Sequence, residues 1–489
     1  MTCLYLSAAH KSSGKTTLTL GLARALRKRG LRVQTFKKGP DYIDPIWHGQ
    51  AAGRSCYNLD FHMMTRAEIR DLFAQHAAPA DITLIEGNKG LYDGMDLEGS
   101  DSNAAMAKLL GAPVILVLDT QGMTRGIAPL ILGYQAFDAE VKIAGVILNK
   151  VGGPRHEGKL RAVIERYTDV QVLGALPRAP QLEIAERHLG LIPCNETPEA
   201  EARIEAIATL VAERVDLNTL LALAAPVKQA TPTACALVGR GTGLRIAIAQ
   251  DRAFGFYYQE DLDTLRAAGV ALLPVDTFRD TRLPEADGLI LGGGFPEVFI
   301  EALAANRALR ADIRRAIESG LPTYAECGGL MYLSRSLTWG ERRGEMVGVI
   351  PGDCVMHTRP VGRGYVELAG TGASELAPDD GGFIPAHEFH HSSLVNLPPG
   401  LVYAYRMVRG EGIDGHHDGV VVGNLLAAYS HRRGSGERGW IAPFLDKVRA
   451  YAALKKHAER QVLLAPPRGA GWAKPGPGGA RKQPSRCAA

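Results

Sequence analysis

The chain has 489 residues, of which 46% are hydrophobic and 22% are charged, a composition typical of folded globular proteins. This length exceeds what one hydrophobic core usually supports, so we expect two large domains. The formal net charge is +4, but the last 24 residues (466–489) carry five basic residues and no acid, so the rest is nearly neutral and a nucleic-acid surface is not indicated.

The sequence contains no signal for a membrane or for export. No run of eighteen apolar residues predicts a membrane span, and the N-terminus lacks the basic flank and long apolar core of a secretory signal. We therefore expect a cytoplasmic protein. The seven cysteines include no CxxC pair, so neither a zinc site nor a disulfide framework is predicted.

Short β-branched runs alternate with amphipathic stretches over the first half of the chain. The runs lie at residues 3–9, 32–39, 82–87, 113–119, 143–151 and 170–177. Helical patterns lie at residues 16–30, 102–111 and 198–215. This alternation is typical of α/β proteins whose parallel sheet is covered by helices on both faces. We expect residues 1–225 to form such a domain.

A nucleotide-binding loop is predicted between the first strand and the first helix. Residues 9–17 read AHKSSGKTT, which matches G-x-x-x-x-G-K-[ST] except that Ala9 replaces the first glycine. Such a loop directs backbone N–H groups, a lysine and a hydroxyl at phosphates and Mg²⁺. The predicted nucleotide-binding residues are Ser13, Gly14, Lys15, Thr16 and Thr17.

Carboxylates follow two other strands of the predicted sheet. Asp41 and Asp44 follow the second strand, and Glu86 ends a later one in the stretch EGNKGLYDG. The carboxyl ends of parallel strands share one edge of the sheet, where ligands bind. Thr16, Glu86 and either Asp41 or Asp44 could therefore bind Mg²⁺ with phosphate oxygens; we assign Thr16, Asp41 and Glu86. Turn formation is the alternative for a single aspartate.

Asn149 ends a later strand of the same domain. Its side-chain amide could bind an adenine edge of the nucleotide, or it could simply cap the strand end. Both interpretations stay open at this point.

Residues 226–244 mix Pro, Thr and Gly without a period and are predicted to be a linker. Strand-like runs at residues 244–251, 270–277, 288–295 and 321–329 then predict a second α/β domain over residues 245–445. A C-terminal helix is assigned to residues 446–465. The tail, 466–489, is rich in Pro, Gly and basic residues and is predicted to be disordered.

Cys327 lies in PTYAECGGLMYL, where a strand-like run meets two glycines and a helix start. This pattern is typical of a nucleophile elbow, which exposes its side chain at a sharp turn. Gly328 and the glycine-rich loop at Gly293 and Gly294 could supply oxyanion donors. His431 is the predicted base, with His387, His390 and His391 as competitors.

Together these motifs resemble the cobyrinic acid a,c-diamide synthase family of glutamine-dependent tetrapyrrole amidotransferases. The resemblance rests on SSGKTTLTLGLARALRKRGLRVQTFKKGPDYIDPIWH, EG..GLYDG, AKLLGAPVILVLD, ERHLGL, LGGGFPE, AECGGLMYL, HEFHHS and AYSH, and covers nearly the whole chain apart from the tail.

The resemblance implies a P-loop synthetase domain followed by a class I, triad-type glutaminase domain. It implies that ATP–Mg²⁺ phosphorylates a macrocycle carboxylate and that Cys327, with His431 as base, releases ammonia from glutamine. Ammonia then displaces phosphate to give the carboxamide. By motif match, Tyr42, Asp44 and Asp93 are expected at the substrate, together with Lys89. The partners would be glutamine and a tetrapyrrole carboxylate, and a homodimer is possible.

Two positions differ from the family pattern. Arg433 stands where many such glutaminases have a glutamate that orients the catalytic histidine, so a Cys–His pair is expected, with Glu437 as a weaker third candidate. Asn88 and Lys89 replace two usually apolar residues, which leaves sirohaem or sirohydrochlorin open as alternative rings. An alternative of another class is a P-loop ATPase switch whose partner domain is not catalytic.

Overall fold

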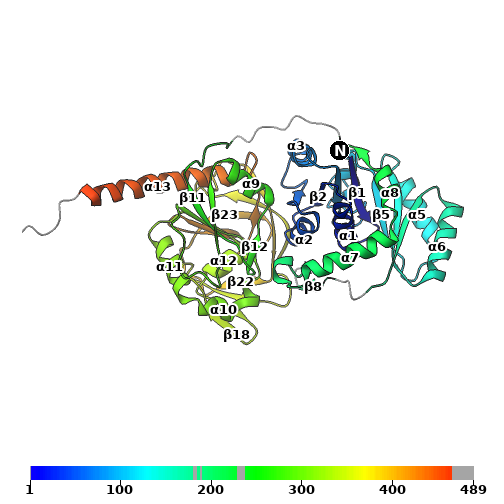
Figure 1. Cartoon of the computed structure of the whole chain (residues 1–489). Helices are drawn as coiled ribbons and strands as arrows, with labels where there is room; N and C mark the ends of the chain where they lie inside the picture. Colours follow the sequence, from blue (N-terminus) through cyan, green and yellow to red (C-terminus); the bar gives the residue numbers. More distant parts are fainter. Residues whose placement is uncertain (1, 180–183, 185, 188–189, 228–236, 465–489) are drawn as a thin grey trace, which may run out of the picture.

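The computed structural model describes residues 2–179, 184, 186–187, 190–227 and 237–464, with side chains left out at 186–187, 190 and 458–464. The predicted disordered tail and residues 228–236 of the predicted linker lie outside this part of the chain. Two α/β domains lie side by side (Figure 1). Among the described helices, none has both the length and the apolar character needed to cross a membrane.

The first domain is built on a parallel sheet. In spatial order its strands are β3 (Tyr57–Leu59), β2 (Val33–Lys38), β4 (Ile82–Glu86), β1 (Thr2–Ala8), β5 (Val114–Asp119), β6 (Ile143–Val151) and β7 (Gln171–Pro177). The short β10 (Ala225–Pro226) pairs antiparallel with the start of β1. The six predicted strands of this half are confirmed, and β3 is an additional edge strand.

Helices cover both faces of this sheet. They are α1 (Lys15–Lys28), α2 (Ile43–Ala52), α3 (Arg66–Ala77), α4 (Asn103–Leu110), α5 (Ile127–Phe137), α6 (Pro154–Tyr167), α7 (Ala200–Arg214) and α8 (Leu217–Leu223). A 3-10 turn, η2 (Cys194–Glu196), and a small hairpin of β8 (Glu186–Arg187) and β9 (Gly190–Leu191) precede α7.

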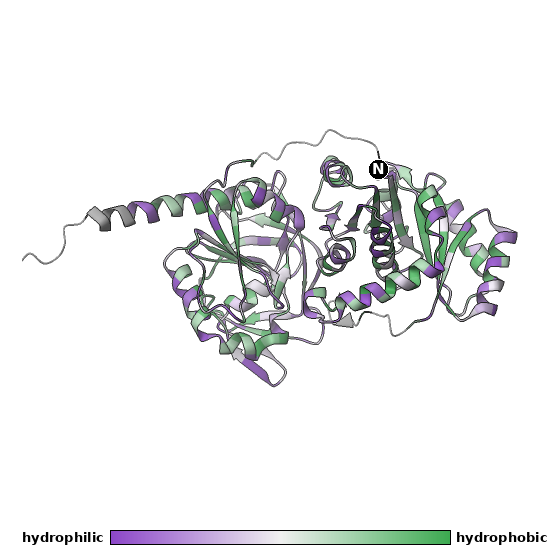
Figure 2. Ribbon diagram, viewed as in Figure 1, coloured by the Kyte–Doolittle hydropathy of each residue, from purple (hydrophilic) through white to green (hydrophobic). Residues whose placement is uncertain are grey.

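The alternation along β1 shows why both faces are covered. Leu4 and Leu6 belong to one buried cluster and Cys3 and Tyr5 to another. A strand that is apolar on both sides must lie inside a sheet covered by helices. Figure 2 shows hydrophobic residues concentrated on the strands and on the inward faces of the helices.

The second domain contains a mixed sheet. Its strand order is β13 (Ala271–Val275), β11 (Arg245–Ala249), β14 (Gly288–Leu291), β16 (Thr323–Glu326), β25 (Leu425–Ala428), β24 (His417–Val422), β23 (Val402–Arg409), β20 (Gly362–Gly370), β21 (Phe383–His390) and β26 (His431–Arg432). The strands from β13 to β25 are parallel, and those from β24 onward pair antiparallel. The four predicted strands of this domain all lie in the parallel half.

Smaller elements complete this domain. A second sheet joins β18 (Arg342–Glu345), β17 (Ser336–Trp339), β19 (Asp353–Met356) and β22 (Ser392–Val395), and β12 (Phe254–Phe256) pairs with β15 (Gly293–Gly294). The helices are α9 (Gln259–Ala267), the 3-10 turn η3 (Pro296–Phe299), α10 (Ile300–Ala305), α11 (Arg307–Glu318), α12 (Gly328–Leu333) and α13 (Ile441–Leu464).

The C-terminal helix α13 begins at Ile441, within the segment assigned to the second domain. Its first turns are packed, because Ile441, Phe444 and Val448 belong to a buried cluster of that domain. Leu454, further along, is 71% exposed. Figure 1 shows the helix projecting away from the domain, which fits a helix anchored only at its start.

Candidate functional site

The phosphate loop has the predicted geometry. It connects β1 to α1, and Gly14 adopts a left-handed backbone with φ of 88° directly before the helix begins at Lys15. A side chain at Gly14 would collide with the amide of Asn149, since an added Cβ would lie 2.1 Å from Asn149 Nδ2. Asn149 donates to the carbonyl of Ser13 over 2.8 Å, so its amide holds the loop in place.

A cavity of about 640 Å³ lies at this loop. Gly14, Lys15, Thr16, Thr17 and Asn149 line it, whereas the fully buried Ser13 bonds to the carbonyl of His10. Burial lowers the pKa of Lys15 to about 8, although Glu86 opposes this shift. An anion in the cavity would favour the charged lysine, which is the environment that a phosphate-binding lysine requires.

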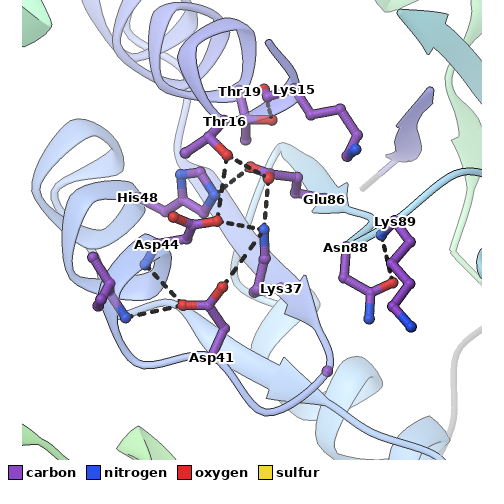
Figure 3. Close-up of polar contacts among 12 residues, drawn as sticks. Lys15, Thr16, Thr19, Lys37, Asp41, Asp44, His48, Glu86, Asn88 and Lys89 are labelled. Carbon is purple, nitrogen blue, oxygen red and sulfur yellow. Dashed lines mark hydrogen bonds and ion pairs between the residues drawn. The ribbon is translucent and has the colours of Figure 1, made fainter. Parts of the chain in front are cut away.

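Thr16, Asp44 and Glu86 converge beside the loop around one cation, Lys37 (Figure 3). Lys37 Nζ lies 2.5 Å from Asp44 Oδ2 and 2.6 Å from Glu86 Oε1. Thr16 Oγ1 donates to the same Glu86 oxygen over 2.8 Å. Two carboxylates thus hold an ammonium at the phosphate edge, and Thr16 bonds to both of them.

The electrostatics of this cluster follow from its burial. Burial alone would lower the pKa of Lys37, but the carboxylates of Asp44 and Glu86 raise it above its usual value. Burial would raise the pKa of Glu86, but Lys37 and His48 hold it below its usual value; His48 Nε2 lies 2.6 Å from Glu86 Oε2. Glu86 and Lys37 therefore keep each other charged.

Both aspartates line the cavity at the phosphate loop. Asp44, predicted at the substrate, contacts Thr16 and Lys37. Asp41, predicted at the metal, lies 3.8 Å from Lys37 Nζ and also lines a second cavity, between the domains. Asp41 Oδ1 accepts from the backbone N–H groups of Ile43 and Asp44 at the start of α2, which orients the loop.

The predicted cysteine lies at a strained turn between β16 and α12. Cys327 has φ of 46° and ψ of −100°, an uncommon conformation for a residue with a side chain. Such strain at a strand-to-helix turn is typical of a nucleophile elbow. Burial raises the pKa of the Cys327 thiol, so a base is needed to produce the thiolate.

The three predicted oxyanion glycines meet beside this cysteine. A Cβ at Gly328 would lie 2.9 Å from the backbone nitrogen of Gly294. A Cβ at Gly293 would lie 2.7 Å from Cε1 of His431. Because neither glycine has a side chain, Gly328 can lie close to the backbone of Gly294, and Gly293 close to the ring of His431.

His431 follows β25, the strand next to β16, and lines the interdomain cavity together with Cys327. Its Nδ1 lies 3.4 Å from Glu326 Oε2, which fits a carboxylate that orients a histidine base. Glu326 itself is positioned by Tyr324, whose hydroxyl donates over 2.6 Å, and by the backbone N–H of Arg432. Sequence reasoning missed Glu326, although it directly precedes Cys327.

The competing candidates have other contacts. Glu437 lies on an exposed loop, and Arg433 pairs with Glu68 and Glu260. His390 Nδ1 contacts the carbonyl of Ser392, and its ring stacks on Tyr429. His391 Nδ1 contacts the carbonyl of His357. His387 stacks on His431 with ring centroids 4.9 Å apart, so it supports the base from one side.

The interdomain cavity has a volume of about 580 Å³ and is lined by predicted site residues of both domains. Cys327, Gly294 and His431 line it from the second domain. From the first domain, the predicted substrate residues Tyr42, Lys89 and Asp93 line it, whereas Asp44 lines only the cavity at the phosphate loop. Tyr42 is 8% exposed and packs on Phe256, with ring centroids 5.6 Å apart, and on His431, at 5.1 Å.

Comparison with known proteins agrees with this geometry. Residues 8–192 match the CobQ/CobB/MinD/ParA nucleotide binding domain, and residues 245–436 match the CobB/CobQ-like glutamine amidotransferase domain. A protein of Magnetococcus marinus called cobyrinate a,c-diamide synthase is 48% identical over 91% of this chain and 96% of its own. The chain belongs to the cobyrinate a,c-diamide synthase family.

Other members of the cobyrinate a,c-diamide synthase family align over similar lengths. A relative of that name from Listeria monocytogenes is 42% identical over 88% of this chain and 96% of its own. One from Methanosarcina acetivorans is 39% identical over 92% of this chain and 96% of its own. Among solved structures, PurLQS from Thermotoga maritima covers 43% of this chain and 99% of its own at 18% identity, with a TM-score of 0.34.

Proposed function

We propose that this protein is an ATP-dependent ligase that uses glutamine to convert peripheral carboxylates of cobyrinate into carboxamides. The observation that carries this proposal is the cavity lined both by Cys327 and by the first-domain loop that contains Asp41 and Tyr42. The names of the relatives favour cobyrinate over a sirohaem-type ring. A non-catalytic switch is not favoured, because a switch needs no strained thiol beside a histidine base.

The synthetase step begins with a carboxylate of the ring, which is a poor electrophile. Its oxygen attacks the γ-phosphorus of ATP, ADP leaves, and an acyl phosphate forms. Lys15 binds the phosphates, and Lys37 lies between Asp44 and Glu86 where negative charge would be transferred. Asn149 keeps the loop shaped for the nucleotide.

We further propose that Mg²⁺ accompanies ATP. Thr16, Asp44 and Glu86 would hold the ion, since all three present hard oxygen donors at the cavity beside the phosphate loop. Phosphate oxygens and waters would complete the coordination. When bound, the ion neutralises charge on the transferred phosphoryl group.

The glutaminase step starts at Cys327. Its sulfur attacks the side-chain amide carbon of glutamine while the thiol proton passes to His431, which Glu326 orients. Backbone N–H groups near Gly294 and Gly328 stabilise the oxyanion. His431 returns the proton to the leaving ammonia, and water then hydrolyses the thioester to glutamate. Ammonia attacks the acyl phosphate, and phosphate leaves.

Two substitutions test the proposal. Cys327→Ser is expected to abolish synthesis from glutamine but to retain synthesis from added ammonium, because the two chemistries lie in different domains. Lys15→Ala is expected to abolish both. Cys354→Ser, at another buried free thiol of the same domain, is the matched control and should keep both. If Cys327→Ser lost synthesis from glutamine and from ammonium equally, the assignment of the two reactions to different domains would be wrong.

Mass spectrometry identifies the ring. Wild-type protein is incubated with ATP, Mg²⁺ and glutamine and with cobyrinate, hydrogenobyrinate, sirohydrochlorin or sirohaem, one at a time. We expect amides to be added to cobyrinate. Amidation of sirohaem or sirohydrochlorin alone would overturn the choice of ring but not the chemistry. A cytoplasmic location and a homodimer remain predictions, and light scattering of the purified protein tests the second.

A further inference from the structure

Basic side chains from both domains line the interdomain cavity. Lys11, Lys38 and Lys89 come from the first domain, and Arg363 on β20 and Arg409 at the end of β23 come from the second. Among the described residues, no carboxylate lies within ion-pair distance of any of these five side chains. Arg363 is held by stacking instead, with its guanidinium 5.3 Å from the centre of the Phe389 ring.

The acidic side chains of the same cavity are engaged in a different way. Asp41 accepts hydrogen bonds from two backbone N–H groups, Asp93 from that of Gly90, and Asp101 from that of Met95. Glu388 accepts from the backbone N–H groups of Glu411 and Gly412, just after β23. Each of these acids therefore accepts hydrogen bonds from the protein's own backbone, whereas the five basic side chains are available to bind a ligand.

Lys38 gives the strongest indication that the ligand of these basic side chains is an anion. The residue is only 4% exposed, and its ammonium faces the cavity without a hydrogen-bond or ion-pair partner among the described residues; Asp60 and Asp101 act on it only from a longer distance. Burial lowers the pKa of Lys38, so an anion bound in the cavity would stabilise its charged form. Consecutive side chains of a strand point to opposite sides, so Lys37 reaches the phosphate cluster while Lys38 reaches the cavity.

Aromatic groups provide a surface that a flat apolar ring could contact. Phe256, Tyr365 and Phe389 line the cavity from the second domain, and Met95 does so from the first. Tyr365 is fixed by a hydrogen bond from its hydroxyl to Asp60 of the first domain. The cavity thus combines apolar walls with cations at several points, which suits a large ring bearing several carboxylates.

We propose that the macrocycle is bound between the two domains, with Arg363 and Arg409 of the glutaminase domain binding ring carboxylates that are not being amidated. Lys38 and Lys89 bind further carboxylates from the synthetase side. The glutaminase domain then has a second role, as half of the ring-binding site. This inference rests on the proposed function, since it assigns residues to the same substrate.

The test uses added ammonium in place of glutamine, so that no glutaminase chemistry is required. In this assay Arg363→Gln and Arg409→Gln should each raise the KM for the ring by about 10- to 100-fold, the usual range for one lost hydrogen bond to a charged group. Arg406→Gln removes the same charge from the same strand outside the cavity and should leave this KM unchanged. Arg363→Lys, which keeps the charge but not the planar fork, should give an intermediate value.

A modified ring provides the second half of the experiment. The second ring carries methyl esters at its non-reacting carboxylates, and the second protein combines Arg363→Gln with Arg409→Gln. Wild type should bind the ester ring as weakly as this double variant binds the natural ring. The double variant should bind both rings equally. Melting temperatures confirm that the variants fold. Ring KM values within twofold of wild type in both arginine variants would overturn the inference, whereas failure of wild type to amidate any tetrapyrrole would instead overturn the proposed function.

Discussion

At the scale of single residues, Lys37 has the most informative environment. Its ammonium lies among Thr16, Asp44 and Glu86, where two carboxylates would otherwise repel one another. Removing one charge from such a buried cluster leaves the others without a partner, which lowers the stability of the fold. Lys37 therefore supplies the positive charge that the two buried carboxylates need.

We expect Lys37→Met to lower the free energy of unfolding by about 3–5 kcal/mol, the usual cost of removing one partner from a buried ion pair. Added Mg²⁺ should raise the melting temperature of this variant more than that of wild type, because the ion replaces the missing charge. Thermal unfolding with and without Mg²⁺ measures both effects.

Lys38→Met is the matched control, one residue further along the same strand. It removes an ammonium that has no hydrogen-bond or ion-pair partner among the described residues and whose pKa burial lowers, so it should leave stability unchanged or raise it. Equal destabilisation by the two substitutions, or no added response to Mg²⁺ in Lys37→Met, would contradict this account of the cluster.

At the scale of elements, the start of helix α2 lies between the phosphate-loop site of the first domain and the cysteine site of the second. Tyr42 is the residue directly before α2, and its loop contains Asp41. Its ring packs on His431 and on Phe256 of the second domain. A change in the loop that contains Asp41 would therefore reach His431, the proposed base, through the packed ring of Tyr42.

Tyr42→Ala is expected to change glutamine hydrolysis, although residue 42 belongs to the synthetase domain. Loss of the ring leaves a space beside His431 and frees it to move, so kcat for glutamine hydrolysis should fall about tenfold or more. Tyr42→Phe keeps the packing and should stay near wild type. A glutaminase assay measures this, and an unchanged kcat in Tyr42→Ala would show that the contact is not used.

Prediction from sequence succeeds for the elements whose signal is contiguous. Lys15 and Cys327 lie in short motifs at the junction of a strand and a helix, so their positions follow from local pattern. The pairing of Glu326 with His431 depends on β16 and β25 lying side by side, which no local pattern reveals. Lys37 was missed because a lysine ending a strand is usually solvated, whereas this one is surrounded by carboxylates that come from two other segments.

The antiparallel half of the second sheet was not predicted for a different reason. Most of its strands pair with strands that are near in sequence, such as β23 with β24 and β24 with β25, but turn-rich segments interrupt the apolar pattern there. Alternating apolar and polar residues in these strands are a weaker signal than the continuous apolar runs of the parallel strands, which are buried on both faces. Arg363 and Arg409 lie on these strands, so the ring-facing surface of the glutaminase domain was invisible from sequence.

At the scale of the whole molecule, Arg433 joins the two domains. Its guanidinium lies 2.7 Å from Glu68 on α3 and 3.2 Å from Glu260 on α9. Related interdomain bonds run from Tyr57 to Asp263 and from Tyr365 to Asp60. The arginine that replaces the expected triad glutamate thus contributes to the domain interface.

Arg433→Met should destabilise the protein by about 3–5 kcal/mol at neutral pH, because Glu260 would remain buried without its partner. Burial raises the pKa of Glu260, although Arg433 opposes this. A carboxyl whose folded pKa is raised costs stability once pH exceeds its unfolded pKa, so the deficit of the variant should grow as pH rises from 5 to 8. Thermal unfolding at several pH values measures it.

Glu260→Gln added to Arg433→Met should restore most of the loss and flatten the pH dependence. Arg438→Met, which breaks an exposed pair with Asp380, should cost no more than about 1 kcal/mol. A double variant no more stable than Arg433→Met would mean that the arginine acts on the interface by packing instead of charge.

The shared cavity also governs the order in which substrates can combine with the enzyme. A ring held between the domains covers Cys327 from the synthetase side, so glutamine that enters by this route must bind first. Saturating ring should therefore inhibit the steady-state rate with glutamine but not the rate with ammonium, whose small size lets it pass. Simple saturation by the ring with both nitrogen donors would show that glutamine has an independent entrance.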